Sequence, residues 1–110
     1  MVRGDIVYIR NGQDKSTGSE WQKNRPAIVV SNNACNEHSP VIEVVYITTS
    51  RRKHLLPTHV IIHSTPIHSV ALCEAVYSVD KSRIECVIGH CSTNEVLRIN
   101  NALAISLGLI

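Results

Sequence analysis

The residues that could do chemistry begin with an arginine at the entrance of an apolar segment. Arg25 and Pro26 lead directly into the apolar residues 27–30, and Glu20 stands five positions earlier in a polar stretch. The Val and Ile residues of this segment favour a β-strand, and Pro26 restricts the backbone next to the arginine. A guanidinium offers a planar set of donors that matches two phosphate oxygens. An arginine before a strand is also commonly a solvated surface charge, so Arg25 alone leaves both interpretations open.

A second group of polar residues follows the apolar segment 41–48. Thr48 and Thr49 stand where this segment changes from aliphatic to hydroxyl residues, and the basic run 51–54 comes directly after them. A hydroxyl at this position could donate to a phosphate oxygen, and the basic run could follow a nucleic-acid backbone. The competing interpretations are a hydroxyl-rich turn and a solvated charged loop.

Four aromatic residues could stack on nucleic-acid bases. They are Tyr8, Trp21, Tyr46 and Tyr77. Trp21 is the strongest candidate, because a tryptophan in a polar segment is otherwise costly to expose.

Histidines and cysteines provide little support for other chemistries. His59 and His63 are predicted to lie on one face of a strand, with no neighbouring nucleophile or carboxylate indicated. The closest cysteines, Cys86 and Cys91, form a C-x4-C pair that does not match usual zinc spacing, so reduced thiols buried as small hydrophobic groups are expected. The sequence has no Walker loop, no G-x-S-x-G and no H-E-x-x-H. We predict neither a metal site nor a cofactor.

The element pattern indicates strands followed by one helix. Strands are predicted at residues 3–9, 27–31, 41–48, 58–63, 70–76 and 86–91, with a loop at 10–24, a turn at Asn32 and Asn33, and a helical turn capped by Asp80. The C-terminal helix begins with the capping-box pair Ser92 and Glu95. The order predicts a mainly β, α+β fold in one domain, residues 1–110, built as an antiparallel sheet or a small barrel with a helix packed on it.

Composition limits what the core can contain and which partners and locations are expected. The 110 residues carry a net charge of +2 and include no Phe, one Trp and three Tyr, so the core must be aliphatic. This charge is too small to indicate nucleic-acid binding by itself. No signal peptide and no membrane-spanning run is recognised, and a cytoplasmic protein is expected.

Five short motifs occur in a characteristic order. They are R-G-D-I-V from Arg3, G-S-E from Gly18, R-P-A-I-V-V from Arg25, L-P-T-H-V from Leu56 and D-K-S-R-I from Asp80. In order and spacing, over nearly the whole chain, they resemble the MazF/PemK family of toxin endoribonucleases. The resemblance implies an SH3-like, PemK-like antiparallel barrel with a C-terminal helix, and a homodimer.

The resemblance also implies an activity. Members of this family cleave single-stranded RNA, usually mRNA, with sequence specificity and without a metal ion, leaving 2′,3′-cyclic phosphate and 5′-hydroxyl ends. A cognate antitoxin with an acidic C-terminal segment silences them. The family's catalytic arginine and hydroxyl residue correspond to Arg25 and Thr48. Arg25 is better suited to stabilising charge than to acting as a base, because the pKa of arginine lies far above neutrality.

The predicted RNA contacts surround these two residues. They are Ser19, Glu20, Trp21, Thr49, Arg51, Arg52, Lys53, Glu74 and Tyr77. One segment departs from the family: where E-Q-[IV]-R-T is common, this chain has Glu74-Ala75-Val76-Tyr77-Ser78. Tyr77 could compensate for the missing arginine by stacking on a base. Two alternatives remain, a non-catalytic toxin of the same fold that binds a protein such as gyrase and a nucleic-acid-binding barrel without activity.

Overall fold

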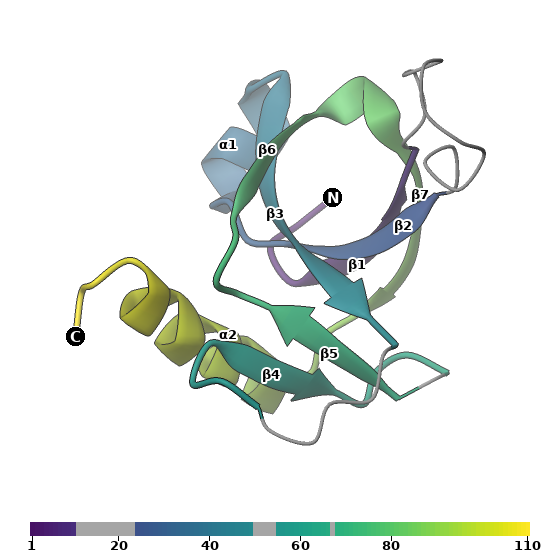
Figure 1. The fold of residues 1–110 in the computed structure, drawn as a ribbon. Coiled ribbons are helices and arrows are strands. Elements are labelled where there is room, and N and C mark those ends of the chain that lie inside the picture. Colours follow the sequence, from purple (N-terminus) through teal and green to yellow (C-terminus); the bar gives the residue numbers. More distant parts are fainter. Residues whose placement is uncertain (11–23, 50–54, 67) are drawn as a thin grey trace, which may run out of the picture.

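The computed structural model describes residues 1–10, 24–49, 55–66 and 68–110, which form one antiparallel sheet and two α-helices (Figure 1). The strands are β1 (Asp5–Ile9), β2 (Arg25–Val29), β3 (Val41–Thr48), β4 (His59–Ile62), β5 (Ser69–Leu72), β6 (Tyr77–Asp80) and β7 (Ile84–His90). The helices are α1 (Asn33–His38) and α2 (Thr93–Ser106), with a 3₁₀ turn, η2 (Lys81–Arg83). Neither α-helix in this described part has the length and hydropathy that a membrane crossing requires.

Strand β3 organises the sheet. The strand order is β4-β5-β3-β2-β1-β7, and β6 pairs with β3 outside this path. Strand β6 pairs with the first half of β3 and β5 with its end, so both share one edge of the same strand. The predicted mainly β, antiparallel fold with a C-terminal helix is confirmed, and the sheet is open: among the described residues, no strand ladder joins the two ends of the path, β4 and β7.

The curved part of the sheet is completed by the chain itself. Strands β1, β2, β3, β6 and β7 and the turn η2 surround a common centre in Figure 1, and we call this arrangement the ring. The amide of Lys81 donates to Pro40 and the amide of Arg10 donates to Arg83, at 2.9 and 2.8 Å. These two bonds tie η2 to the start of β3 and to the end of β1.

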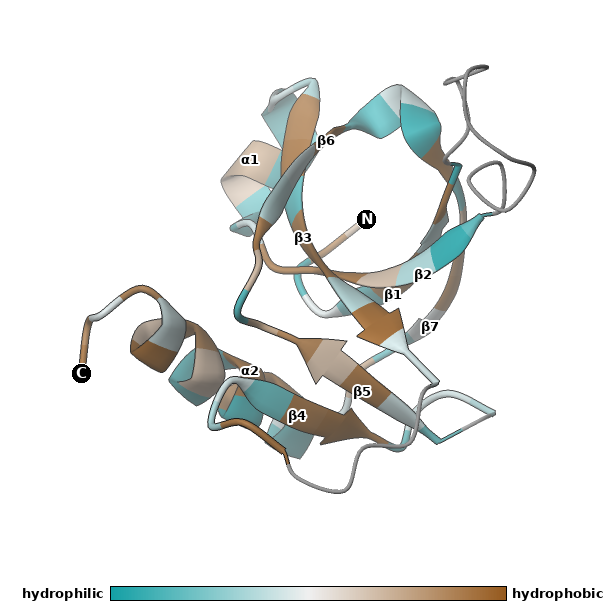
Figure 2. Ribbon diagram, viewed as in Figure 1, coloured by the Kyte–Doolittle hydropathy of each residue, from teal (hydrophilic) through white to brown (hydrophobic). Residues whose placement is uncertain are grey.

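Alternation along the strands creates two cores on opposite faces of the sheet. Figure 2 shows the apolar residues of β3, β4 and β5 and the polar character of η2. The helix-side core contains Ile6, Ile28, Val45, Ile47, Val60, Ile62, Ala71, Cys73, Cys91, Ile99 and Ala102. The ring-side core contains Val7, Ile9, Ala27, Val29, Ile42, Val44, Tyr46 and Val79. Even-numbered residues of β3 thus face the ring side, and Val45 and Ile47 face the helix side.

Several local predictions are confirmed. Strand β3 has the predicted bounds. The carboxylate of Asp80 accepts from the amide of Ser82 at 2.8 Å and caps η2. Ser92 and Glu95 form the predicted capping box of α2.

Other local predictions were wrong. The strand predicted at 27–31 is β2, which begins at Arg25, includes Pro26 and ends at Val29; pairing with β3 starts only at Ala27. The predicted turn at Asn32 and Asn33 is the start of α1, where the side chain of Asn32 caps the amide of Cys35. The predicted strand 70–76 ends at Leu72, and the chain turns before it resumes as β6.

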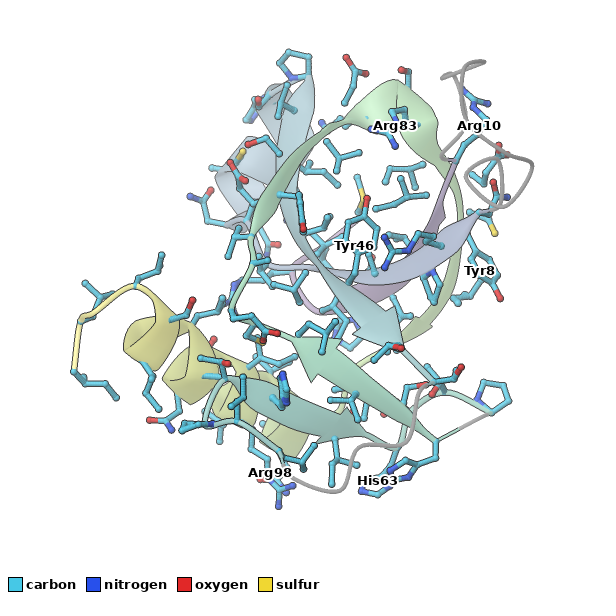
Figure 3. All side chains as sticks on the ribbon, viewed as in Figure 1. Tyr8, Arg10, Tyr46, His63, Arg83 and Arg98 are labelled. Carbon is cyan, nitrogen blue, oxygen red and sulfur yellow. The ribbon has the colours of Figure 1, made fainter. Side chains whose placement is uncertain are left out.

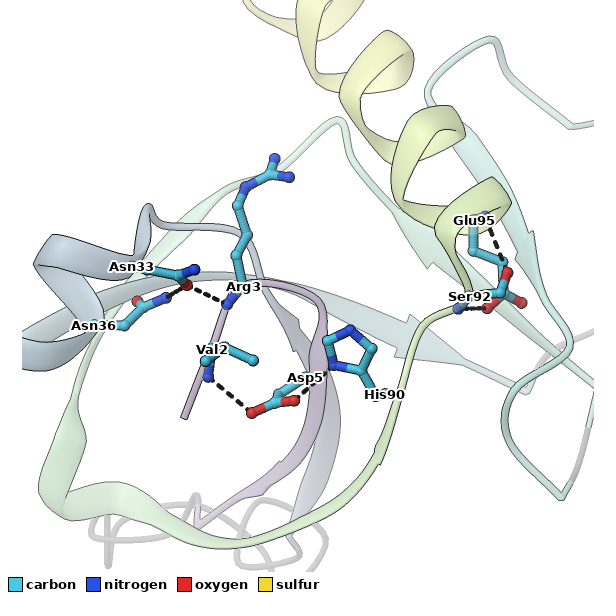
Figure 4. Close-up of polar contacts among 8 residues, drawn as sticks. All are labelled: Val2, Arg3, Asp5, Asn33, Asn36, His90, Ser92 and Glu95. Atoms are coloured by element: carbon cyan, nitrogen blue, oxygen red, sulfur yellow. Dashed lines mark hydrogen bonds and ion pairs between the residues drawn. The ribbon is translucent and has the colours of Figure 1, made fainter.

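The N-terminal turn is fixed by side-chain hydrogen bonds. The Asp5 carboxylate accepts from the amide of Val2 and contacts His90 Nδ1, at 2.9 and 2.7 Å (Figure 4). The amide of Arg3 donates to Asn33 Oδ1 at 2.7 Å. Gly4 has a φ of 95°, and a Cβ there would lie 3.2 Å from the His90 ring. The R-G-D start of the chain therefore has a structural role, which is to join β1 to β7 and α1.

Candidate active site

The site is built on the ring-side face of β2 and β3. Ala27 of β2 pairs with Tyr46 of β3, and Arg25 lies two residues before Ala27 on the same face of its strand. Arg25 is thus the diagonal neighbour of Tyr46, a position from which a long side chain reaches across. Figure 3 shows Tyr46 inside the ring, and Tyr8 outside it.

The guanidinium of Arg25 lies over an aromatic ring. Its Cζ is 4.2 Å from the centroid of the Tyr46 ring, which is a cation–π contact. Tyr46 is 8% exposed and belongs to the ring-side core, whereas Arg25 is exposed. Among the described residues, no carboxylate pairs with Arg25. The cation therefore rests on an apolar surface and faces solvent.

Thr48 shares this face. It follows Tyr46 by two residues on β3, so both side chains lie on the same side of the strand. The pairing of β2 with β3 advances one residue at a time from Val29 to Ala27, and its continuation brings Arg25 level with Thr48. The predicted catalytic pair therefore stands at one end of two neighbouring strands, on one face.

Tyr77 extends the site along the same face. It pairs with Val44 of β3, and its ring meets that of Tyr46 edge-on, with centroids 5.1 Å apart and an interplanar angle of 64°. Tyr77 is 49% exposed. Sequence reasoning named Tyr46 only as one of four stacking candidates. Its even-numbered spacing from Thr48 was the signal that would have placed it in the site.

Two predicted RNA contacts lie away from this group. Thr49 is exposed on the opposite face, where it lines a pocket of about 140 Å³ with Tyr8, Pro26, Ile47 and Ile88 among its walls.

The Glu74 carboxylate contacts Thr58 Oγ1 at 3.2 Å and His59 Nε2 at 3.1 Å. Partial burial raises the pKa of Glu74, but its hydrogen bonds and the His59 charge outweigh this and lower it. Another hollow, of about 440 Å³, lies between β4 and α2.

The remaining predicted contacts fall outside the described residues. They are Ser19, Glu20, Trp21, Arg51, Arg52 and Lys53. Their roles stay predictions.

The histidine and cysteine predictions are partly wrong. His63 lies beyond the end of β4 and is exposed, whereas the side chain of His59 is 2% exposed against Glu74. Burial raises the pKa of both Cys73 and Cys91 to about 12, consistent with thiols acting as small core groups. Cys86 is instead exposed on β7. Across the described segments, no three His, Cys, Asp or Glu side chains gather as metal ligands would.

Sequence comparison relates the chain to known toxins over almost its full length. Residues 2–107 match the family described as PemK-like, MazF-like toxin of type II toxin–antitoxin system. The chain is 35% identical to Endoribonuclease MazF of Staphylococcus saprophyticus subsp. saprophyticus, covering 99% of this chain and 92% of that protein. It is 34% identical to Endoribonuclease MazF of Staphylococcus epidermidis, covering 99% and 93%.

Structure comparison agrees with the sequence. An endoribonuclease in complex with its cognate antitoxin, from a mycobacterial species, superposes with a TM-score of 0.81 at 29% identity, covering 100% of this chain and 97% of that one. An endoribonuclease from a mycobacterial species gives a TM-score of 0.78 at 28% identity, covering 98% and 91%.

Proposed function

The chain belongs to the PemK-like, MazF-like toxin family of type II toxin–antitoxin systems, and from that premise we propose that it is an endoribonuclease acting on single-stranded RNA. One observation carries the proposal: an exposed arginine, Arg25, lies on the same sheet face as the hydroxyl residue Thr48, at the end of two paired strands. This arrangement offers hydrogen-bond donors to a phosphodiester that approaches from solvent.

The reaction that fits these donors is transphosphorylation. The 2′-oxygen of the RNA attacks the adjacent phosphorus, and the bond from phosphorus to the 5′-oxygen breaks. The 2′-hydroxyl gives up its proton and the departing 5′-oxygen takes one up, so the products are a 2′,3′-cyclic phosphate and a 5′-hydroxyl. Arg25 donates to the non-bridging oxygens as negative charge builds on them, and the Thr48 hydroxyl supports the same charge. Because the attacking hydroxyl belongs to the substrate, this scheme needs neither a protein nucleophile nor a metal ion.

Two kinds of partner follow from the family. We propose that a cognate antitoxin with an acidic segment neutralises the toxin, as the antitoxin complex of the mycobacterial relative suggests. We also propose that residues 1–110 act as one domain and that two copies form a homodimer on mRNA. Light scattering of the purified chain, alone and with the antitoxin, would measure both assemblies.

The test of the activity is a cleavage assay in EDTA. Mixed-sequence RNA is incubated with the wild type, with Arg25→Ala and with Thr48→Val, and the fragments are sequenced and their ends analysed. We expect cyclic phosphate and 5′-hydroxyl ends from the wild type, and losses of roughly 10²- to 10³-fold for Arg25→Ala and roughly 10- to 100-fold for Thr48→Val. Intact RNA with folded wild-type protein would contradict the proposal and favour a non-catalytic toxin.

A further inference from the structure

The support of Arg25 sets it apart from an ordinary surface arginine. A side chain of this length loses many rotamers when it is ordered, so an exposed arginine at a strand end normally samples several positions. Here the guanidinium lies 4.2 Å above the centre of the Tyr46 ring. A cation over an aromatic face is attracted by the ring's charge distribution, so this contact restricts the positions of the guanidinium.

The Tyr46 ring is itself fixed on two sides. It is 8% exposed within the ring-side core, and the edge-on contact with Tyr77 at 5.1 Å restrains it from β6. Its cross-strand partner is Ala27, whose small side chain leaves the face of the ring open to the diagonal Arg25. The support under the cation is therefore a rigid part of the sheet.

We propose that Tyr46 is a positioning residue for Arg25: its ring holds the guanidinium in the orientation that meets the phosphate during cleavage. The inference rests on the proposed ribonuclease activity. Tyr46 acts through the arginine and does not contact the reacting atoms. Its effect should fall on turnover more than on RNA binding, because preorganised donors act mainly as charge develops in the transition state.

A double-mutant cycle tests this role. Tyr46→Phe keeps the ring, and Tyr46→Leu removes it while keeping an apolar group; Tyr46→Met is a second ring-free variant in case the first does not fold. We expect kcat within about twofold of wild type for Tyr46→Phe and a loss of roughly 5- to 30-fold for the ring-free variants, with KM changed less than kcat. In the Arg25→Ala background, removing the ring should cost almost nothing further. Equal losses in both backgrounds would overturn the inference, because the ring would then act only as core.

A second measurement separates this inference from the proposed activity. The ring current of Tyr46 should shift the Arg25 side-chain protons in NMR spectra, and Tyr46→Phe should retain this shift while Tyr46→Leu abolishes it. If the wild type cuts no RNA, the proposed activity fails, and the NMR comparison by itself decides whether the ring holds the guanidinium. Arg25 side-chain shifts that are the same in Tyr46→Leu as in the wild type would overturn the inference.

Discussion

Arg25 and Glu95 are charged side chains held in opposite ways. Glu95 is 4% exposed, and its carboxylate accepts from the amides of His63 and Ser92 at 2.5 and 2.8 Å and from the Ser64 hydroxyl at 2.5 Å. Arg25 is exposed and rests on a ring. Glu95 has its hydrogen-bonding capacity used within the fold, where it joins α2 to the loop after β4. Arg25 keeps donors directed to solvent, which is what a group that meets a substrate requires.

This contrast predicts that substitution of Arg25 lowers activity but not stability, and that substitution of Glu95 lowers stability but not activity. The largest expected effect is that of Arg25→Lys on activity. We expect cleavage to fall roughly 10²-fold although the charge is kept, because lysine lacks the planar fork. The urea midpoint should change by no more than the equivalent of about 0.5 kcal/mol, as for other exposed sites. A large loss of stability would show that Arg25 is part of the structural framework.

The next effect is that of Glu95→Gln on stability. We expect a loss of about 2–3 kcal/mol in the free energy of unfolding at neutral pH, since an amide cannot accept all the donors that converge there. Glu37, whose side chain is 76% exposed, provides the matched control: Glu37→Gln should be neutral. Cleavage per folded molecule should match wild type. Lower activity per folded molecule in Glu95→Gln would contradict the prediction that Glu95 contributes to stability alone.

The same carboxylate predicts a pH dependence. Burial raises the pKa of Glu95, but the hydrogen bonds from Ser64, Ser92 and His63 outweigh it and lower the pKa from 4.5 to about 2. A lowered folded-state pKa gives stability that is fully present above pH 4.5 and is lost as the pH falls toward about 2. Urea titrations across this range should show the loss in wild type and a smaller loss in Glu95→Gln. Parallel curves for the two proteins would contradict this assignment.

The smallest effect concerns Tyr77. Its contact with Tyr46 predicts that Tyr77→Ala costs about 0.5–1.5 kcal/mol of stability, while Tyr77→Phe retains it. If a base also stacks on its exposed face, Tyr77→Ala weakens oligonucleotide binding roughly 5-fold or more, and Tyr77→Phe again does not. Fluorescence anisotropy with a labelled oligonucleotide measures the second effect. Unchanged binding would leave Tyr77 as a support for Tyr46 only.

Local signals in the sequence predicted local structure well. Three features depend only on residues a few positions apart, so the sequence predicts them directly. They are the capping box at Ser92 and Glu95, the cap at Asp80 and the apolar run of β3. Helix α1 was missed because its six residues show no apolar periodicity, although Asn32 was a usable cap signal.

Long-range features were less predictable. The chain is interrupted between β5 and β6 because both strands pair with one edge of β3, and the residue pattern of 70–76 alone does not indicate this interruption. The open sheet was also difficult to predict, because it depends on which distant strands pair. The family resemblance selected Arg25 and Thr48, but Tyr46 joined them only through cross-strand register, which links positions distant in sequence.

The pairing of β5 with β3 is short, and this has a consequence for the timescales of motion. Only Ile47 with Ala71 and Thr48 with Val70 are paired there among the described residues. The β4–β5 hairpin, covered by α2, can therefore behave as a cooperative unit that opens before the ring does, and amide hydrogen exchange would detect it as a less protected segment. Thr48 lies at that seam. Opening of the hairpin would therefore break the pairing of Thr48 with Val70 and change the position of this hydroxyl.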